Sequence, residues 1–399
     1  KSDSHSKCHK IYCFSNMIRS FIFFTLFFLS IEIGFSNIIS FSKDGKNEDT
    51  INVNLDEVSN DSSVQVKELV FDNIDSIQSD EILSIDSASA RIRFCKPYSF
   101  FERSAVLNKP RIGMALGLTG ASYIGLNFWW SKAWYSNYEK SKFQLFNDSK
   151  EWNQVDKIGH GFSAYLESTW SAQVFEWAGM KPKKAAWLGF GVAQMWQLAI
   201  EFQDAFSAKW GFSLSDVAAN IGGAGWNVWQ EYAWGEQRIW LKESAWPTNY
   251  PDSLQGRANS LFGKSFAEGI LKDYNSTTFW LSASIGSFIK KPDSKFPKWI
   301  NVAFGYGAQN MYGGFENKWC AEGGADDLIE NCPPDKIIDR TDIQRIRQFY
   351  LSADIDWIRI PTKSKALKTF FSLLNIIKIP FPAIEFNTAR QVKWHWLMF

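Results

Sequence analysis

Three segments between residues 154 and 232 place charged side chains among mainly apolar neighbours, at the three- and four-residue spacing of one helical face. Burying a carboxylate or an ammonium group is costly unless the group is paired or hydrogen-bonded. We therefore expect helices over 154–178, 184–206 and 213–232 whose polar residues meet in one network. The residues expected in this network are Asp156, Lys157, His160, Gln197, Glu201, Asp204, Ser213, Asp216 and Asn220.

The order of these segments places the polar residues at one end of the predicted helices. In an antiparallel arrangement, the start of the first helix, the end of the second and the start of the third lie together. His160, then Glu201 and Asp204, then Asp216 occupy those positions. The positive end of a helix dipole near Asp216 would also favour a carboxylate there. We expect these four residues and Asn220 to approach one another.

A histidine beside several carboxylates permits three interpretations: a structural network that fixes helix register, a binding or catalytic pocket, or a metal site. For catalysis, His160 would donate or accept a proton, Glu201 and Asp204 would act as base or cation ligands, and Asp216 with Asn220 would orient the substrate. The sequence has no zinc-ligand spacing, nucleophilic serine motif, phosphate-binding loop or HExxH motif. It therefore predicts neither a metal nor a cofactor.

Residues 111–130 are of a different character. The 19 residues after Arg111 carry no charge, close to the ~20 residues that span a bilayer. Four glycines offer a small-residue face for another helix, and Trp129 and Trp130 resemble an interfacial aromatic belt. We expect a helix that inserts into the membrane; the alternative is a buried helix of a soluble bundle.

Upstream, the sequence has the pattern of a secretory signal. Met17 is followed by Arg19, by an apolar run over 21–29 and by small residues near Gly34. We expect cleavage there and export; the alternatives are an uncleaved anchor or a core helix. A lipoprotein signal would need a cysteine at the cleavage point, and the absence of one there predicts no lipid attachment through this signal.

The remaining chain divides by composition. An excess of Ser, Asp, Asn and Glu predicts an acidic flexible spacer that could still form a short strand. Four segments from about residue 275 onward, ending in the aromatic Phe399, suggest strands, best shown by the alternation in LSADIDWIRI. We prefer a small sheet packed on the helices; the alternative is a partial or shared barrel. The predicted divisions are 1–36 (upstream segment and signal), 37–105 (spacer), 106–245 (helices) and 246–399 (β-rich region).

Two cysteines, Cys320 and Cys332, bracket a loop rich in Gly, Asp, Asn and Pro. In an oxidising compartment they could pair and stabilise the fold by roughly 2–4 kcal/mol; the alternative is two free thiols. The formal net charge is +1, from 43 basic and 42 acidic side chains. This balance argues against a nucleic-acid partner, which needs a basic excess.

Three motifs in a fixed order carry a family resemblance: DKIGH at 156–160, IEFQD at 200–204 and SLSDVAANIGGAGW at 213–226. Over about 108–240, the chain resembles the VanZ-like families, and most closely the YfiM-type group of predicted periplasmic lipoproteins. The resemblance implies helices and an envelope location in a Gram-negative bacterium, but no established reaction. The missing lipoprotein cysteine and the long β-rich extension depart from this pattern.

Together these features predict an α+β protein with about four membrane-associated helices followed by a β-rich region. The favoured function is a noncatalytic, exported envelope protein, periplasmic and associated with either membrane. It would bind membrane lipid or another envelope protein. The alternatives are a membrane-embedded enzyme acting on a lipid-linked or cell-wall substrate, and an outer-membrane barrel or assembly component.

Overall fold

The structure is a computed structural model that describes residues 83–86, 91–94, 103–130, 140–289, 296–321 and 332–399. Residues 101–399 belong to one compact unit, which contains both long helices and a sheet. A short antiparallel hairpin, β1 (Leu83–Asp86) and β2 (Arg91–Phe94), belongs to a separate unit. The predicted signal segment lies outside the described residues.

Four long helices occupy the four predicted segments. They are α4 (Lys109–Trp130), α5 (Val155–Trp177), α6 (Pro182–Ala205) and α7 (Leu214–Trp234). Their ends follow local rules: Pro182 occupies the first turn of α6, and the Ser213 hydroxyl caps α7 by accepting from the Asp216 amide at 3.0 Å. Gly235 ends α7 at φ +67°, in the left-handed region that glycine tolerates.

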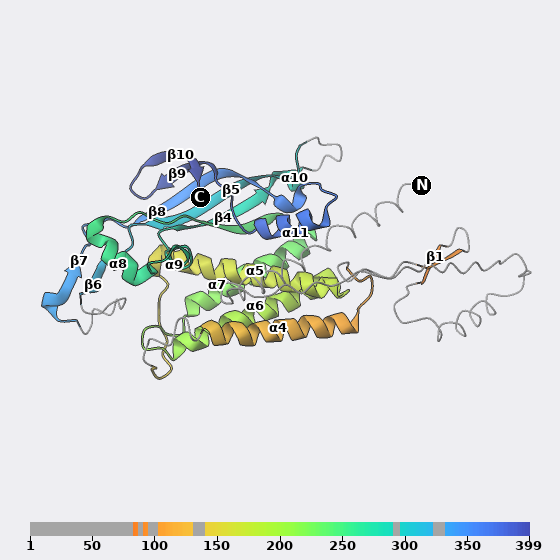
Figure 1. Cartoon of the computed structure of the whole chain (residues 1–399), viewed down its shortest axis with the longest axis horizontal. Helices are drawn as coiled ribbons and strands as arrows, with labels where there is room; N and C mark the ends of the chain where they lie inside the picture. Colours follow the sequence, from red (N-terminus) through yellow and green to blue (C-terminus); the bar gives the residue numbers. More distant parts are fainter. Residues whose placement is uncertain (1–82, 87–90, 95–102, 131–139, 290–295, 322–331) are drawn as a thin grey trace, which may run out of the picture. The chain divides into compact units, whose positions relative to one another are not determined.

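Helix α5 is central, since both α6 and α7 pack against it (Figure 1). Glycines bring the backbones together. A Cβ on Gly223 of α7 would lie 1.8 Å from the carbonyl oxygen of Gly161 on α5, and one on Gly189 of α6 would lie 2.2 Å from the carbonyl oxygen of Ser168. These contacts exclude any larger residue and bring the polar faces of three helices within reach of one another.

The expectation of a membrane-spanning helix over 111–130 is corrected. Helix α4 forms there and packs against α5 and α6, but no helix within the described ranges is long and apolar enough to cross a bilayer. In α4, four glycines together with Thr119, Ser122 and Asn127 dilute the apolar side chains.

The C-terminal region contains a six-stranded antiparallel sheet in the order β10-β9-β8-β5-β4-β3. Its strands are β3 (Ile239–Ala245), β4 (Thr277–Ser284), β5 (Ile300–Gln309), β8 (Ile346–Ile355), β9 (Phe381–Asn387) and β10 (Val392–Met398). Strand β3 lies wholly inside the range 106–245 expected to be helical. Its buried residues are Trp240, Lys242 and Ser244, so its sequence has no apolar alternation that would predict a strand. The aromatic C-terminal segment is a hairpin, β9–β10, and not a single strand. The mixed fold and the C-terminal sheet are confirmed.

Shorter elements surround the sheet. Four short helices were not predicted: α8 (Asp252–Phe262), α9 (Phe266–Lys272), α10 (Ile285–Phe288) and α11 (Lys365–Leu374). A two-stranded ribbon pairs β6 (Lys318–Cys320) with β7 (Ile337–Asp339). Three 3₁₀ turns cover Glu151–Gln154, Pro334–Lys336 and Trp357–Arg359. A disulfide joins Cys320 to Cys332, the pair suggested by the sequence, beside this ribbon.

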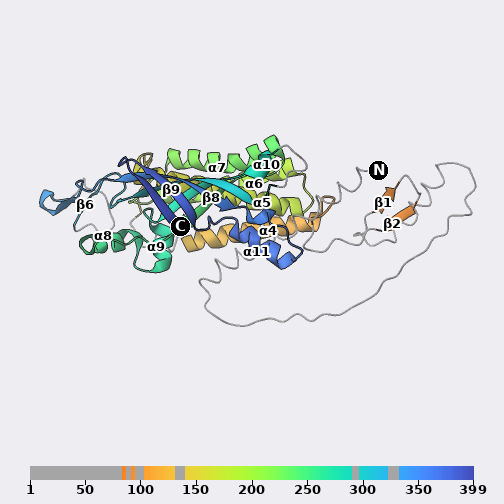
Figure 2. The same cartoon turned by 90° about the horizontal axis from the view of Figure 1, so that it is seen from above.

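The sheet covers one side of α5, and α4 lies on the opposite side of the helices (Figure 1). Seen from above, the strands overlie the helices (Figure 2). Helix and sheet share one core: the ring of Phe162 on α5 lies 5.4 Å from that of Phe279 on β4, and Tyr165 lies 6.3 Å from Trp240 on β3. This packing fixes the start of α5 beside the sheet.

Candidate functional site

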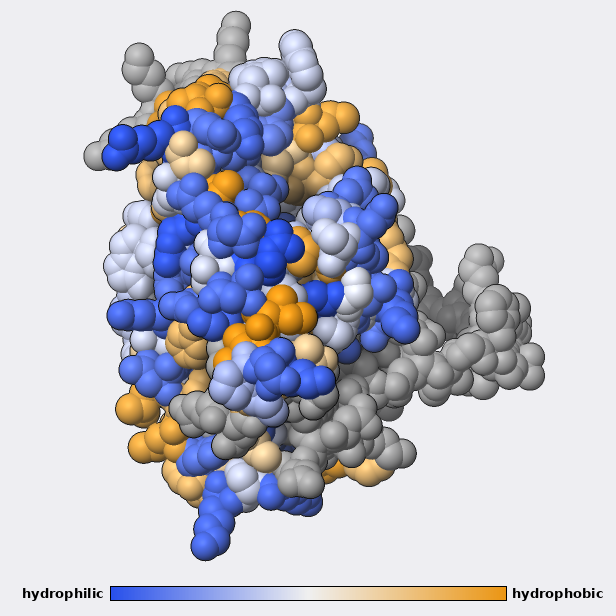
Figure 3. All heavy atoms as spheres, turned by 90° about the vertical axis from the view of Figure 1, so that its left-hand side faces the viewer, coloured by the Kyte–Doolittle hydropathy of each residue, from blue (hydrophilic) through white to orange (hydrophobic). Residues whose placement is uncertain are grey.

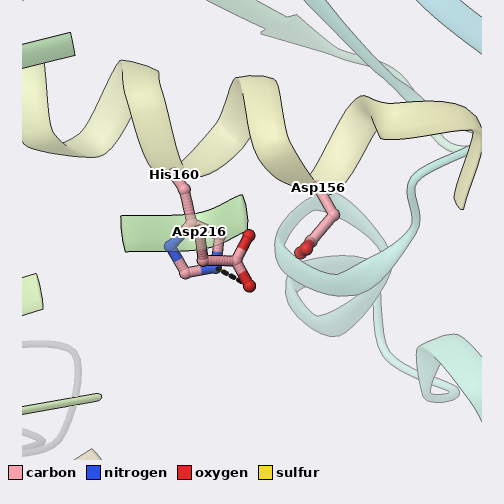
Figure 4. A group of neighbouring side chains, drawn as sticks. All are labelled: Asp156, His160 and Asp216. Atoms are coloured by element: carbon pink, nitrogen blue, oxygen red, sulfur yellow. Dashed lines mark ion pairs between the residues drawn. The ribbon is translucent and has the colours of Figure 1, made fainter. Parts of the chain in front are cut away.

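The starts of α5 and α7 and the end of α6 bring acidic, basic and imidazole side chains together. In Figure 4, His160 of α5 and Asp216 of α7 point toward one another, and Asp156, one turn earlier on α5, points toward the same space. The Nε2 atom of His160 lies 3.8 Å from Oδ2 of Asp216. Its Nδ1 atom lies 3.8 Å from Oε1 of Glu201, near the end of α6. The histidine thus stands between two carboxyl groups from two other helices.

Lys157 holds three carboxylates at once. Its Nζ atom lies 2.6 Å from Asp148, 2.8 Å from Asp156 and 2.7 Å from Asp216. Burial alone would lower the pKa of Lys157, but the charges of Asp156 and Asp216 outweigh it and hold the pKa above its usual value. The lysine is therefore a fixed positive charge at the centre of the cluster.

Asp148, which the sequence did not single out, links the cluster to the N-cap of α7. Its Oδ1 atom accepts hydrogen bonds from the hydroxyls of Ser213 and Ser215, each at 2.6 Å. Burial raises its pKa, but hydrogen bonds from neighbouring groups outweigh this and bring it to about 2. The Ser213 amide in turn donates to Oε2 of Glu201 at 3.2 Å. The cap of one helix is thereby tied to the end of another.

The remaining carboxyl groups differ in how well burial is compensated. Burial raises the pKa of Glu201 to about 8 and that of Asp216 to about 6, even though His160 lowers both. Burial also opposes ionisation of Asp156, but His160 and Lys157 hold its pKa below the usual value. For His160, burial is outweighed by Asp156, Asp216 and Glu201, which raise its pKa.

Not every predicted residue joins this cluster. Gln197 donates to both carboxylate oxygens of Glu167 at 3.0 Å, away from Glu201. Asn220 is buried one turn after Asp216, and the Gln194 side chain reaches its backbone carbonyl at 3.1 Å. Asp204 is half-buried, and its charge contributes to the raised pKa of Glu201 after burial and nearer groups.

Tyr274 is a second cluster member that sequence reasoning missed. Its hydroxyl donates to Oδ1 of Asp156 at 2.5 Å from the turn that precedes β4. Tyr274 lies 118 residues from Asp156, so helical spacing carried no signal for it. For a metal ion, the structure offers donor atoms of Asp156, His160 and Asp216 within 4.8 Å of one another.

A second feature lies on the outer surface, where α6 and α7 have reversed polarity. Small or polar residues face inward, and large apolar residues face outward; Trp187, Ile221 and Trp229 are 53%, 49% and 47% exposed. The buried polar residues of α7 are Asp216, Asn220, Asn227 and Gln230. Exposed apolar residues of the two helices are Trp187, Leu188, Met195, Phe202, Leu214, Ile221, Trp229 and Tyr232.

This surface differs from one end of the molecule. Figure 3 looks onto the end at which Figure 1 places α8, β6 and β7, and that end is mainly hydrophilic with small separate apolar patches. On α6, by contrast, exposed positions recur as Trp187, Gly191, Met195 and Phe202, which follow one side of the helix. The start of α6 adds Lys183 and Lys184 around a shallow depression lined by Trp187 and Tyr232.

Residues 145–231 match a protein family described as a predicted periplasmic lipoprotein (DUF2279). The matched range contains the polar cluster apart from Tyr274, together with α5, α6 and nearly all of α7. No curated protein and no solved structure matches the chain. The match supports an exported, periplasmic envelope protein and the YfiM-type part of the resemblance. It does not test the wider relation to the VanZ-like families.

Proposed function

We propose that this envelope protein binds anionic membrane lipid through the outward faces of α6 and α7. The reversed polarity of these two helices carries the proposal. Water does not favour a helix that buries Asp216 and Asn227 while it exposes Ile221 and Trp229, whereas an apolar phase does. The inner faces of these helices are polar, so only their outer, apolar faces would enter the lipid. The helices would therefore lie on the bilayer surface.

The positive charge at the start of α6 favours anionic lipid. Lys181, Lys183 and Lys184 are exposed next to Trp187, whose indole donates to the Tyr232 hydroxyl at 3.2 Å. The ammonium group of Lys183 lies 4.7 Å from the Tyr232 ring. Aromatic residues favour the headgroup region, and each lysine near an anionic surface adds about 1 kcal/mol. Phosphatidylglycerol is therefore preferred over zwitterionic lipid.

Vesicle sedimentation tests this proposal. The Ile221→Glu/Trp229→Glu variant should bind phosphatidylglycerol vesicles at least ~10-fold more weakly than the wild type, since each apolar side chain contributes about 1.5–3 kcal/mol when removed from water. The matched control is Val392→Glu/Trp394→Glu, which charges one aliphatic and one tryptophan residue of β10 that are also exposed. Any covalently attached lipid is common to all variants, so their difference reports the helical face.

Equal vesicle binding by both double variants would refute the lipid proposal. Loss of self-association by the helical variant in sedimentation velocity, with vesicle binding unchanged, would assign the face to a second copy of the chain instead. A noncatalytic role also predicts that folded His160 variants bind vesicles like the wild type.

A further inference from the structure

The space between the starts of α5 and α7 has the donor set of a metal site. Asp156, His160 and Asp216 each present one ligand atom, all within 4.8 Å of one another (Figure 4). We propose that these three side chains bind a divalent transition-metal ion of the Zn²⁺ or Mn²⁺ class. Imidazole and carboxylate are ligands that this class accepts, and water would complete the coordination. The proposal is independent of lipid binding.

Glu201 provides an observation apart from the acidic cluster itself. Its side chain is only 1% exposed, and in the described part of the chain its Oε1 atom has no hydrogen-bond partner. This atom is aimed at Nδ1 of His160, 3.8 Å away, which also lacks a partner. A buried acceptor facing a ring nitrogen is the outer part of a carboxylate–histidine–metal triad.

That arrangement assigns the two nitrogens of His160 different roles. In the tautomer with a hydrogen on Nδ1, this N–H would donate a hydrogen bond to Glu201. Nε2 then carries the lone pair, and it faces Asp216. The 3.8 Å between Nδ1 and Glu201 needs a small closure to become a hydrogen bond, whereas the 3.8 Å between Nε2 and Asp216 already suits two ligands that each lie about 2 Å from one ion. Glu201 is accordingly a positioning residue, and His160 is the ligand.

Lys157 and Tyr274 fix the orientation of the two aspartate side chains. Lys157 pairs with Oδ1 of Asp216 and Oδ2 of Asp156, while the Tyr274 hydroxyl holds Oδ1 of Asp156. Oδ2 of Asp216 remains directed at His160. Each carboxylate oxygen has two lone pairs, so these contacts fix the carboxylates and still leave capacity for an ion.

Charge and access both suit a dication. Lys157 contacts three carboxyl groups, those of Asp148, Asp156 and Asp216, so a dication would offset the remaining negative charge when His160 is neutral. The side chains of His160 and Asp156 are 19% and 17% exposed. The cluster is therefore in partial contact with solvent.

Equilibrium dialysis of the chelator-treated full chain against Zn²⁺ or Mn²⁺ tests the proposal. The wild type should bind about one ion per chain more than His160→Gln. His395→Gln is the matched control. His395, on β10, also contacts a buried carboxylate, that of Glu385, at 2.7 Å. Ions bound by the N-terminal histidines and cysteines are common to all three proteins and cancel. Equal ion content in the wild type and His160→Gln overturns the proposal.

A second variant keeps the test decisive if His160→Gln does not fold, as judged by circular dichroism. Glu201→Gln retains the shape of the side chain, and loss of a carboxylate behind a metal-bound histidine lowers metal affinity about 10–100-fold. Wild-type affinity should also fall on acidification, because His160 must lose a proton to bind. Unchanged affinity in folded Glu201→Gln, together with no pH dependence in the wild type, overturns the proposal.

Discussion

In the sheet, a buried lysine contacts one buried aspartate, whereas in the helices one lysine contacts three aspartates. Lys242 of β3 and Asp354 of β8 are fully buried and 2.8 Å apart. The Ser282 hydroxyl donates to the same carboxylate at 2.6 Å, and Lys242 also donates to a backbone carbonyl, that of Ile355, at 2.7 Å. Here one positive and one negative charge are matched in direct contact.

The helical cluster is not balanced in the same way. Lys157 is shared by three aspartates, whereas Glu201 faces the His160 imidazole at 3.8 Å and accepts from the Ser213 amide. Burial raises the pKa of Glu201 to about 8, and the charge of His160 offsets this only in part. A surplus of buried carboxyl groups takes up protons or a cation, whereas a matched pair only stabilises the fold. The difference distinguishes a candidate site from a structural contact.

The largest effect is expected when the balanced pair is broken. Asp354→Asn leaves the Lys242 ammonium buried without its counter-charge, which costs about 3–5 kcal/mol of unfolding free energy. Urea denaturation followed by circular dichroism measures this loss. The Lys242→Met/Asp354→Leu double variant should recover most of it. If Asp354→Asn lowers the unfolding free energy by less than about 1 kcal/mol, the sheet pair does not differ from the helical cluster in the way described.

An intermediate effect concerns pH. The folded pKa of Glu201, about 8, lies above its ordinary value of 4.5. The folded state therefore binds more protons between these values, and its stability falls as pH rises from about 4.5 to 8. His160, whose pKa is also raised, acts in the same direction. In EDTA, Glu201→Gln should lose at least about 1 kcal/mol less than the wild type between pH 5 and 8. Parallel pH profiles would contradict this assignment.

The smallest effect is expected for Asp216→Asn, the helical counterpart of Asp354→Asn. At pH 8 this substitution removes a carboxylate whose ionisation is opposed by burial, which favours folding. It also removes one ion pair of Lys157, which retains its ion pairs with Asp148 and Asp156. These effects oppose each other, so the unfolding free energy in EDTA should change by less than about 1 kcal/mol. A loss as large as that of Asp354→Asn would make the helical cluster a structural network like the pair in the sheet.

Local sequence patterns predicted the helices well, because helical spacing and an N-cap such as Ser213 act within a few residues. The same spacing led to His160, Glu201 and Asp216, which the structure places together. Asp148 and Tyr274 escaped prediction, since a turn and a strand end carry no periodic signal. Strand β3 escaped for a related reason: its buried Lys242 is paired with Asp354 of β8, a strand from which β4 and β5 separate it in the sheet order.

By itself, the sequence determined that β8 and α7 each have two unlike faces. It did not determine which face is buried. On β8, Ser352 and Asp354 are buried while Leu351 is 39% exposed, and α7 likewise buries Asp216 and exposes Ile221. Periodicity separates polar from apolar side chains, but the buried side depends on where partners lie. Lys242 for the strand and Lys157 for the helix come from elsewhere in the chain, so only tertiary packing could make the polar face the inner one.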